Sequence, residues 1–322
     1  MTSGQVLITA GVLTDSGAEA LALLEAAGFT YKVPSGSLAE DGLIRELRGC
    51  VAVIAGNEPY NDAVFDACPE LKVVARWGIG YDAVDVAAAT RHGVMVINTP
   101  GLVTQAVADM TFALMLGIAR RLPYCDGAVR AGDWPGVFSG QVWEKTLGLV
   151  GMGQIGQAVA HRARGFNMRI LVHDPYCDEG VCAYHGGEPA SLEGLLQHSD
   201  FVSLHCTMCP ETRNLINAER LRLMKPTAYL INAGRGGLVD QAALAQALRE
   251  KWIAGAALDV LADEPPDPHD PLLKLDNALL TPHCSSFTYD TVAKVNHQAC
   301  QNVIDALSGV RPASLLNPEV LR

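Results

Sequence analysis

Short apolar runs alternate with amphipathic segments along most of the chain. Runs rich in Val, Ile and Leu predict buried strands, whereas apolar residues recurring every three to four positions predict helices. In the first hundred residues this pattern predicts strands at 6–10, 50–56, 71–77 and 94–98, and helices at 18–27, 38–48, 61–67 and 84–92. Strands separated by helices imply parallel pairing through right-handed crossovers.

The alternation is interrupted at residues 99–101, Thr-Pro-Gly, and a long amphipathic helix is expected from 103 to 121. The apolar excess of that helix suggests a contact between subunits. The alternation then resumes, with strands expected at 147–151, 169–174, 201–205, 228–233, 255–260 and 278–282, and a last helix at 289–307. We therefore expect an α/β fold of two Rossmann-like, doubly wound parallel-sheet lobes with a cleft between them. Residues 1–99 with 286–322 would form one domain, and residues 100–285 the other.

Length and charge narrow the class of protein. A chain of 322 residues is long enough for two domains. Its formal net charge of −11 argues against a nucleic-acid or anionic-membrane partner. The chain has no run of 18 apolar residues and no signal-peptide pattern at its start, so a cytoplasmic protein is expected.

The nine cysteines show no disulfide-framework spacing, which is typical of reduced thiols. Cys206 and Cys209 form a CxxC pattern after His205, but no second ligand pair accompanies them. We interpret that segment as a strand end, and we expect no metal site.

Residues 146–156, TLGLVGMGQIG, carry the most informative motif. An apolar run leads into glycines at positions 151, 153 and 156, a helical segment follows, and the next apolar run ends in Asp174, eighteen positions beyond Gly156. Strand, glycine turn, helix, strand and acid in this order are typical of a dinucleotide site. Gly151 permits the tight turn, Gly153 lets the pyrophosphate approach the backbone, and Gly156 lets helix and strand pack closely. A purely structural glycine turn is the alternative.

Asp174 also indicates which dinucleotide binds. A carboxylate at the end of the second strand accepts hydrogen bonds from ribose hydroxyls and repels a 2′-phosphate. The residues that follow are Pro175, Tyr176 and Cys177, with no Arg or Lys among them. The sequence therefore predicts NAD rather than NADP.

Three residues of the second half are candidate catalytic groups, because each follows an expected strand. Arg235 can hold a carboxylate bidentately. His283 is a suitable proton donor for ketone reduction, since imidazole gains and loses a proton near neutral pH. Glu264 is a carboxylate that could orient it. Taken singly, each could be an ordinary loop residue; together, beside a dinucleotide site, they favour catalysis.

The chain resembles the D-isomer-specific 2-hydroxyacid dehydrogenases, a group that includes D-3-phosphoglycerate dehydrogenases, hydroxypyruvate reductases, D-lactate dehydrogenases and formate dehydrogenases. The resemblance covers nearly the whole chain. Besides the glycine motif and Asp174, the segments that carry it are ARWGIGYDAVD (75–85), LHCTMCPETRNLIN (204–217), MKPTAYLINAGRGGLVD (224–240), GAALDVLADEPP (255–266) and LLTPHCSS (279–286).

The resemblance implies a role for each matching residue. Arg235 would bind the substrate carboxylate, His283 would be the acid/base, and Glu264 would pair with it. The backbone amides of Trp77, Gly78, Ile79 and Gly80 would cradle the carboxylate, with Asn57 also at the substrate site. Gln154 and Ile155 would lie near the phosphates, Thr104 and Cys206 would line the cofactor groove, and Ala233 and Asp259 would hold the nicotinamide. A homodimer is also implied.

The expected function is therefore NAD-dependent interconversion of a D-2-hydroxy acid and its 2-oxo acid. A 3-phosphoglycerate- or phosphonate-type substrate is an alternative on the same machinery. The loop Gly56-Asn57-Glu58-Pro59 disfavours it, because phosphoglycerate enzymes carry an Arg-Ser-type loop there. A non-enzymatic, NADH-sensing protein that resembles a corepressor is a further alternative, made less favourable because no long disordered tail is evident.

Overall fold

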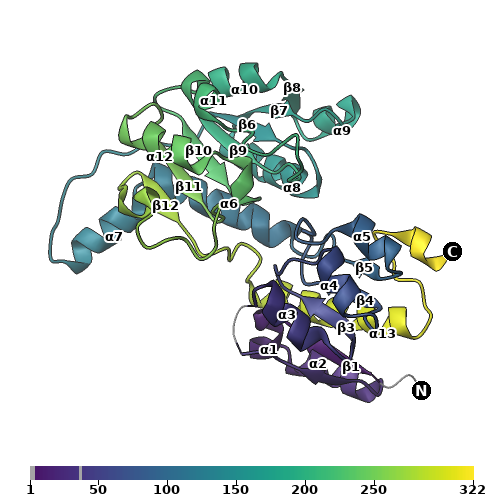
Figure 1. The fold of residues 1–322 in the computed structure, drawn as a ribbon. Helices are drawn as coiled ribbons and strands as arrows, with labels where there is room; N and C mark the ends of the chain where they lie inside the picture. The colour runs from purple at the N-terminus through teal and green to yellow at the C-terminus, as the bar shows by residue number, and fades with distance from the viewer. Residues whose placement is uncertain (1–3, 36–37) are drawn as a thin grey trace. The chain divides into compact units, whose positions relative to one another are not determined.

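The structure is a computed structural model that describes residues 4–35 and 38–322 (Figure 1). Contacts divide it into two compact units. The first unit contains the described residues up to Val103 together with Ser286–Arg322, and the second is Thr104–Ser285. The sequence pattern predicts the first division after residue 99, whereas in the structure the chain changes unit after Val103.

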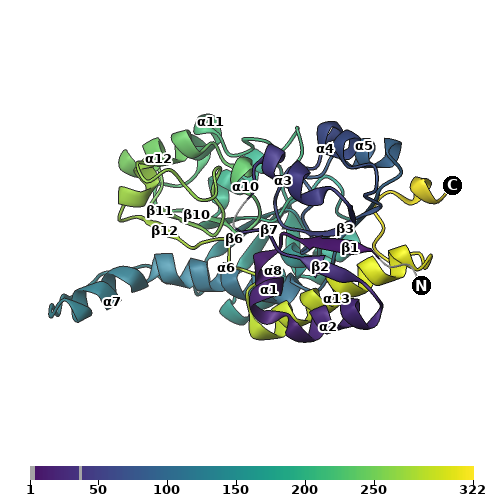
Figure 2. The same ribbon diagram turned by 60° about the horizontal axis from the view of Figure 1, so that its bottom comes forward.

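The first unit is built on a five-stranded parallel sheet with the order β2-β1-β3-β4-β5. Its strands are β1 (Gln5–Ile8), β2 (Thr30–Lys32), β3 (Cys50–Ala55), β4 (Val73–Arg76) and β5 (Met95–Ile97). Two groups of helices cover its faces (Figure 2). One group is α1 (Gly11–Ser16), α2 (Ala18–Ala26) and α13 (Tyr289–Leu307), and the other is α3 (Glu40–Leu47), α4 (Asp62–Ala67) and α5 (Val86–Arg91).

Burial on both faces explains the unbroken apolar runs. In β1, Val6 and Ile8 pack with residues of α2 and α13, while Leu7 between them packs with residues of α3 and α4. A strand covered on both sides is apolar at most positions, as is typical of parallel sheets.

Two elements of this unit were not anticipated. β2 has the sequence Thr-Tyr-Lys and contains no apolar run. The other is α1, which ends with Asp15 and Ser16 and is separated from α2 by Gly17. The Ser16 hydroxyl donates back to the Val12 carbonyl (2.8 Å).

The second unit contains a seven-stranded parallel sheet with the order β12-β11-β10-β9-β6-β7-β8. Its strands are β6 (Thr146–Val150), β7 (Arg169–His173), β8 (Gly187–Pro189), β9 (Phe201–Leu204), β10 (Tyr229–Asn232), β11 (Gly255–Leu258) and β12 (Ala278–Leu280). The strand order reverses direction between β6 and β9. In open α/β sheets, ligands bind beyond the carboxyl ends of the strands at such a switch point.

Helices cover this sheet as well. α6 (Thr104–Ala119) packs on β10, β11 and α8 (Gln154–Ala163). On the other face, a core cluster joins the sheet to α10 (Leu192–His198), α11 (Ala218–Leu223) and α12 (Gln241–Arg249). α9 (Glu179–Tyr184) lies beside β8. Two parallel-sheet, Rossmann-like α/β units therefore confirm the expected fold class.

The apolar excess of α6 is used inside the second unit, where most of its side chains are buried. The next helix, α7 (Leu122–Arg130), behaves differently. It extends away from the rest of that unit (Figures 1 and 2), and none of its residues is buried. Among the described residues, no helix is both long enough and apolar enough to span a membrane.

Candidate active site

The glycine turn after β6 shows why two of its glycines are needed. Gly151 has φ +100°, and a Cβ there would lie 2.5 Å from the backbone nitrogen of Cys206. A Cβ on Gly156 would lie 2.2 Å from the Gly151 carbonyl oxygen. Side chains at these positions would force β9 away from the turn, or α8 away from β6. Both glycines are therefore needed for the close packing at the switch point.

Gly153 has the opposite environment, because a Cβ there would meet no atom within 4 Å. It is the N-cap residue of the ten-residue helix α8, and both Gly153 and Gln154 are exposed. Unpaired amides at a helix N-terminus attract phosphate, and open backbone allows close approach. Thr104, at the start of α6, contacts Gln154 through its hydroxyl (3.5 Å). This part of the site fits a pyrophosphate.

Asp174 directly follows β7, next to the same turn. Its Oδ2 accepts a hydrogen bond from the Met152 amide (2.7 Å), and its Oδ1 accepts one from the Tyr176 amide (2.9 Å). Each carboxylate oxygen offers two acceptor positions. Within the described part of the chain, one position on each oxygen therefore remains for ribose hydroxyls.

His205 and Cys206 follow β9 on the other side of the switch point. Burial lowers the pKa of His205 to about 4, and its Nε2 lies 2.8 Å from the Ser203 hydroxyl. Burial likewise raises the pKa of Cys206 to about 11. Both groups are therefore neutral at physiological pH. No cluster of three or more potential metal ligands occurs among the residues that the structure describes.

His283 and Glu264 are in direct contact. Nδ1 of His283 lies 2.6 Å from Oε2 of Glu264, and about one third of each side chain is exposed (34% and 33%). The other carboxylate oxygen of Glu264 accepts the Leu261 amide (3.0 Å). His283 follows β12 and has φ +50°, in the left-handed region that costs a non-glycine residue about 1–2 kcal/mol.

Arg235 follows β10, the second strand along from β12 in the sheet, so it lies at the same carboxyl edge. Asn232, which is 1% exposed, stabilises the loop that contains Arg235. The Asn232 amide group donates to the Arg235 carbonyl (2.9 Å), and its oxygen accepts the Gly234 amide (3.0 Å). Asn232 was not among the candidate residues, because an asparagine that ends a strand has no distinctive spacing in the sequence.

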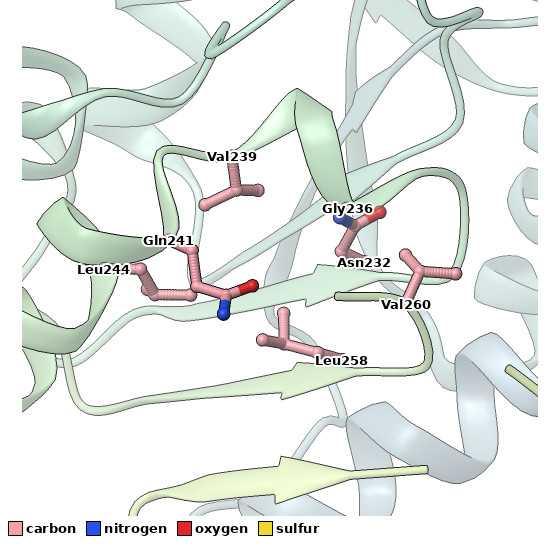
Figure 3. Close-up of a pocket in the computed structure, with 7 residues that line it drawn as sticks. All are labelled: Asn232, Gly236, Val239, Gln241, Leu244, Leu258 and Val260. Carbon is pink, nitrogen blue, oxygen red and sulfur yellow. The ribbon is translucent and has the colours of Figure 1, made fainter. Parts of the chain in front are cut away.

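A small pocket lies beneath these loops (Figure 3), and the Gln241 side chain points into it. Oε1 of Gln241 accepts the Ala262 amide (2.8 Å), and Nε2 donates to Asp270. Gln241 thereby ties the start of α12 to the loop that carries Glu264. A Cβ on Gly236 would lie 1.9 Å from the Leu261 carbonyl oxygen, so the loops of Arg235 and Glu264 pack directly on each other.

Asp259 follows β11 and is 1% exposed. Its carboxylate accepts hydrogen bonds from the Thr281 hydroxyl (2.5 Å), the Cys284 amide (3.0 Å), the Ser285 amide (2.9 Å) and the Ser285 hydroxyl. The Cys284 thiol is a fifth and longer contact (3.7 Å), and all five donors lie within residues 281–285, the segment that contains His283.

Apart from Arg235, the residues expected to bind substrate lie in the first unit. The Trp77 amide donates to the Ala55 carbonyl (3.1 Å), and the Gly78 amide donates to the Thr99 hydroxyl (3.0 Å). These two of the four expected cradle amides are therefore used inside the unit. An anion cradle would rest on the amides of Ile79 and Gly80.

Arg76, which is 3% exposed, links the loop of Asn57 to the loop of Gly80 in this unit. Its Nε donates to the Gly80 carbonyl (2.9 Å), and its Nη2 donates to Oδ1 of Asn57 (2.8 Å). The strand order of this sheet reverses between β1 and β3. At that switch point the Thr9 hydroxyl donates to Glu58 (2.7 Å) and accepts the Gly56 amide (2.9 Å).

This arrangement can be compared with known proteins. Residues 112–285 match the model of the D-isomer specific 2-hydroxyacid dehydrogenase, NAD binding domain. The chain belongs to this family. A glyoxylate reductase from Korarchaeum cryptofilum is 45% identical over 87% of this chain and 86% of its own. One from Thermococcus onnurineus is 44% identical over 88% of each chain.

Two solved structures are also similar in fold to this 2-hydroxyacid dehydrogenase. The TT0316 protein from Thermus thermophilus superposes with a TM-score of 0.86 at 37% identity, over 97% of this chain and 99% of its own. A glyoxylate reductase from Paecilomyes thermophila has a TM-score of 0.86 at 29% identity, over 99% of each chain.

Membership of the family confirms the resemblance noted in the sequence. The protein is a NAD-dependent 2-hydroxyacid dehydrogenase, an enzyme that interconverts 2-hydroxy and 2-oxo acids. The open backbone at Gly153 and the acceptor positions on Asp174 fit that cofactor.

Proposed function

We propose that this enzyme interconverts a small, unphosphorylated 2-oxo acid and the corresponding D-2-hydroxy acid. The observation that carries the proposal is the 2.6 Å contact between Nδ1 of His283 and Glu264, at the carboxyl edge of a sheet whose switch point fits a dinucleotide. NADH, when bound, supplies the hydride for reduction.

His283 is the acid/base in this proposal. Glu264 occupies Nδ1, which leaves Nε2 to donate a proton to the carbonyl oxygen during reduction and to remove it from the hydroxyl during oxidation. Arg235 binds the substrate carboxylate and polarises the 2-oxo group. Asn232 and Gln241 keep the loops of Arg235 and Glu264 in place.

The cofactor would lie along the carboxyl edge of the second unit. The backbone at Gly151, Gly153, Gln154, Ile155 and Gly156 would receive the pyrophosphate, and Asp174 the adenosine ribose. Thr104 and Cys206 would line the groove, and the nicotinamide would lie near Ala233. The neutral Cys206 thiol adds no charge there.

The position of Glu58 supports the proposal that the substrate carries no phosphate group. Thr9 fixes this carboxylate at the switch point of the first sheet, two residues from Gly56, where a phosphate-binding enzyme would need a cation. Several relatives are glyoxylate reductases, so glyoxylate is the first substrate to test. The amides of Ile79 and Gly80, with Asn57 nearby, would hold its carboxylate.

Purified protein should oxidise NADH in the presence of glyoxylate, hydroxypyruvate or another small 2-oxo acid, followed at 340 nm. The product should be the D-enantiomer wherever the substrate gives a chiral product. Preference for a phosphorylated acid would favour the alternative substrate class. NADH binding without turnover of any 2-oxo acid would favour an NADH-sensing protein.

A homodimer is also proposed. α7 has no buried residue, and large apolar side chains on it and on residues 131–143 are exposed; they are Leu122, Tyr124, Val129, Trp134, Phe138 and Trp143. Large apolar side chains exposed in such number along one segment are typical of a protein interface. Light scattering should report a dimer, and replacing both Trp134 and Phe138 by Ser should shift it toward the monomer. A monomeric wild-type protein would contradict this proposal.

A further inference from the structure

Two successive peptide groups of the first unit carry the amides of Ile79 and Gly80. In the first of them, the Gly78 carbonyl accepts the Thr99 amide (3.0 Å). In the second, the Ile79 carbonyl accepts the side-chain amide of Asn98 (2.9 Å). Both peptide groups are trans, so the N–H of each points opposite to its carbonyl. The two amides are therefore directed away from Asn98 and Thr99.

These two amides are accessible to a ligand. Among the described residues, neither the Ile79 nor the Gly80 amide donates a hydrogen bond to another group of the protein, and both residues are partly exposed. The Gly80 carbonyl is held as well, by Nε of the buried Arg76 (2.9 Å). Successive N–H groups in a turn form an anion-binding site. A substrate carboxylate is an anion that would fit it.

Asn98 is itself fixed in the core of the unit. It directly follows β5 and is 5% exposed, and its backbone carbonyl accepts the Asn302 side chain (3.2 Å) and the Ser314 hydroxyl (2.6 Å). Within the described part of the chain, its Oδ1 has no hydrogen-bond partner. A buried amide with one unpaired atom costs stability. The bond to the Ile79 carbonyl is therefore the interaction that this side chain supplies.

We propose that Asn98 is a positioning residue for the binding of the substrate carboxylate. Its side chain orients the peptide group between Ile79 and Gly80, so that the Gly80 amide is preorganised to donate to an anion. Asn98 acts through this loop rather than by contact with the substrate. The inference rests on the proposed function, in which the amides of Ile79 and Gly80 hold the carboxylate.

Two variants of Asn98 test the proposal through the split between KM and kcat. Asn98→Ala removes the donor to Ile79, whereas Asn98→Asp keeps the shape and presents a carboxylate to the Ile79 carbonyl. Amides that bind the substrate carboxylate equally in the ground and transition states lower KM and leave kcat unchanged.

In Asn98→Ala, KM for the best 2-oxo acid should rise by about 10- to 100-fold, the contribution of one hydrogen bond to a charged group. The value of kcat should stay within about threefold of wild type. NADH affinity, measured by fluorescence titration, should not change, because the dinucleotide is expected on the second unit.

In Asn98→Asp, KM at about pH 8 should rise further than in Asn98→Ala, because an ionised carboxylate cannot donate a hydrogen bond. The ratio of this KM to that of wild type should fall as the pH is lowered toward about 5, since a protonated carboxyl group can donate to the Ile79 carbonyl. A loss of packing alone would leave this ratio independent of pH.

Asn317→Ala is a matched control. Asn317 is a fully buried asparagine of the same unit, and it accepts the Val96 amide of β5 (2.9 Å) and donates to the Val94 carbonyl (2.9 Å). It has no hydrogen bond to the loop of residues 78–80 among the described residues. The control should lower Tm at least as much as Asn98→Ala, while KM and kcat stay at their wild-type values.

Other outcomes overturn the proposal or its basis. A wild-type KM in both Asn98 variants would show that the loop keeps its orientation without this side chain. An equal rise of KM in Asn317→Ala would make loss of stability the cause. A fall in kcat with KM unchanged would assign Asn98 to the chemical step instead of binding. If the wild-type protein turned over no 2-oxo acid, the proposed function itself would be wrong.

Discussion

The imidazole of His283 and the carboxylate of Glu264 share a 2.6 Å contact, and the second oxygen of Glu264 accepts the Leu261 amide. Glu264 is therefore held from both sides, by its own loop and by the histidine. Because Nδ1 is occupied, Nε2 is the ring nitrogen that would transfer the proton in the proposed mechanism. General acid/base chemistry at a carbonyl requires a ring of this kind, in which one nitrogen is held by a partner and the other can exchange a proton.

His283→Ala should lower kcat for the best 2-oxo acid by about 10²–10⁴-fold, the usual contribution of a positioned general acid. NADH affinity should change little, because the dinucleotide is expected to lie mainly against the glycine turn and Asp174. Steady-state kinetics and a fluorescence titration check the two parts separately. A kcat near that of wild type would contradict the mechanism.

Glu264→Gln keeps the shape of the side chain and removes its charge. The favourable interaction with a protonated imidazole is then weaker. Reductive activity should consequently fall at a lower pH than in the wild type, when kcat is measured between about pH 5 and 9. Superimposable pH profiles would mean that the 2.6 Å contact does not influence proton transfer.

Arg235→Lys should raise KM for the 2-oxo acid and lower kcat together. A lysine keeps the positive charge, but it cannot hold a carboxylate bidentately or polarise the 2-oxo group from the same geometry. The comparison with wild type uses glyoxylate and hydroxypyruvate at saturating NADH. An unchanged kcat with only KM raised would limit Arg235 to binding.

Asp174→Ser combined with Tyr176→Arg should shift cofactor preference toward NADPH. The double change removes a carboxylate that repels a 2′-phosphate and supplies a cation for it. It also removes the acceptor of the Met152 amide, so some stability should be lost as well. The ratio of kcat/KM for NADPH and NADH measures the shift, and a wild-type preference for NADPH would refute this interpretation of Asp174.

Asp200→Asn should reduce stability in a pH-dependent way. Burial alone would raise the pKa of the Asp200 carboxyl, but the Thr146 amide and the Lys225 ammonium, each 2.9 Å away, together hold that pKa below its ordinary value. A folded-state pKa below the unfolded value of about 3.9 contributes stability above that pH, and the contribution is lost as pH falls through the folded-state pKa.

The expected loss at pH 7 is about 1–2 kcal/mol, and Tm should fall by a few degrees. The Tm difference between variant and wild type should narrow as the pH is lowered below about 4. Thermal unfolding followed by circular dichroism at several pH values checks this. A difference that stays constant with pH would mean that charge on Asp200 is not the cause.

Local patterns in the sequence determined much of the fold. The apolar runs of strands buried on both faces predicted most of both sheets, and the last helix was predicted with its observed bounds, Tyr289–Leu307. Strands such as β2 and β8 were missed, because three residues at or near a sheet edge carry no periodic signal. The same apolar runs indicated that Arg235, Glu264 and His283 each follow a strand. Because parallel strands end at one edge of a sheet, these three residues could be expected at that edge.

The supporting contacts of the site depended on tertiary structure. Nothing in the spacing of Gln241 and Ala262, or of Asp259 and Ser285, indicates that they bond, because each pair joins segments that meet only after the strands have paired. The occupied amides of Trp77 and Gly78 are a similar case, as their acceptors lie on Ala55 and Thr99. The sequence by itself determined which groups end strands. Only the packed chain decided which of their donors and acceptors were already used, because a hydrogen bond depends on distance in space and not along the chain.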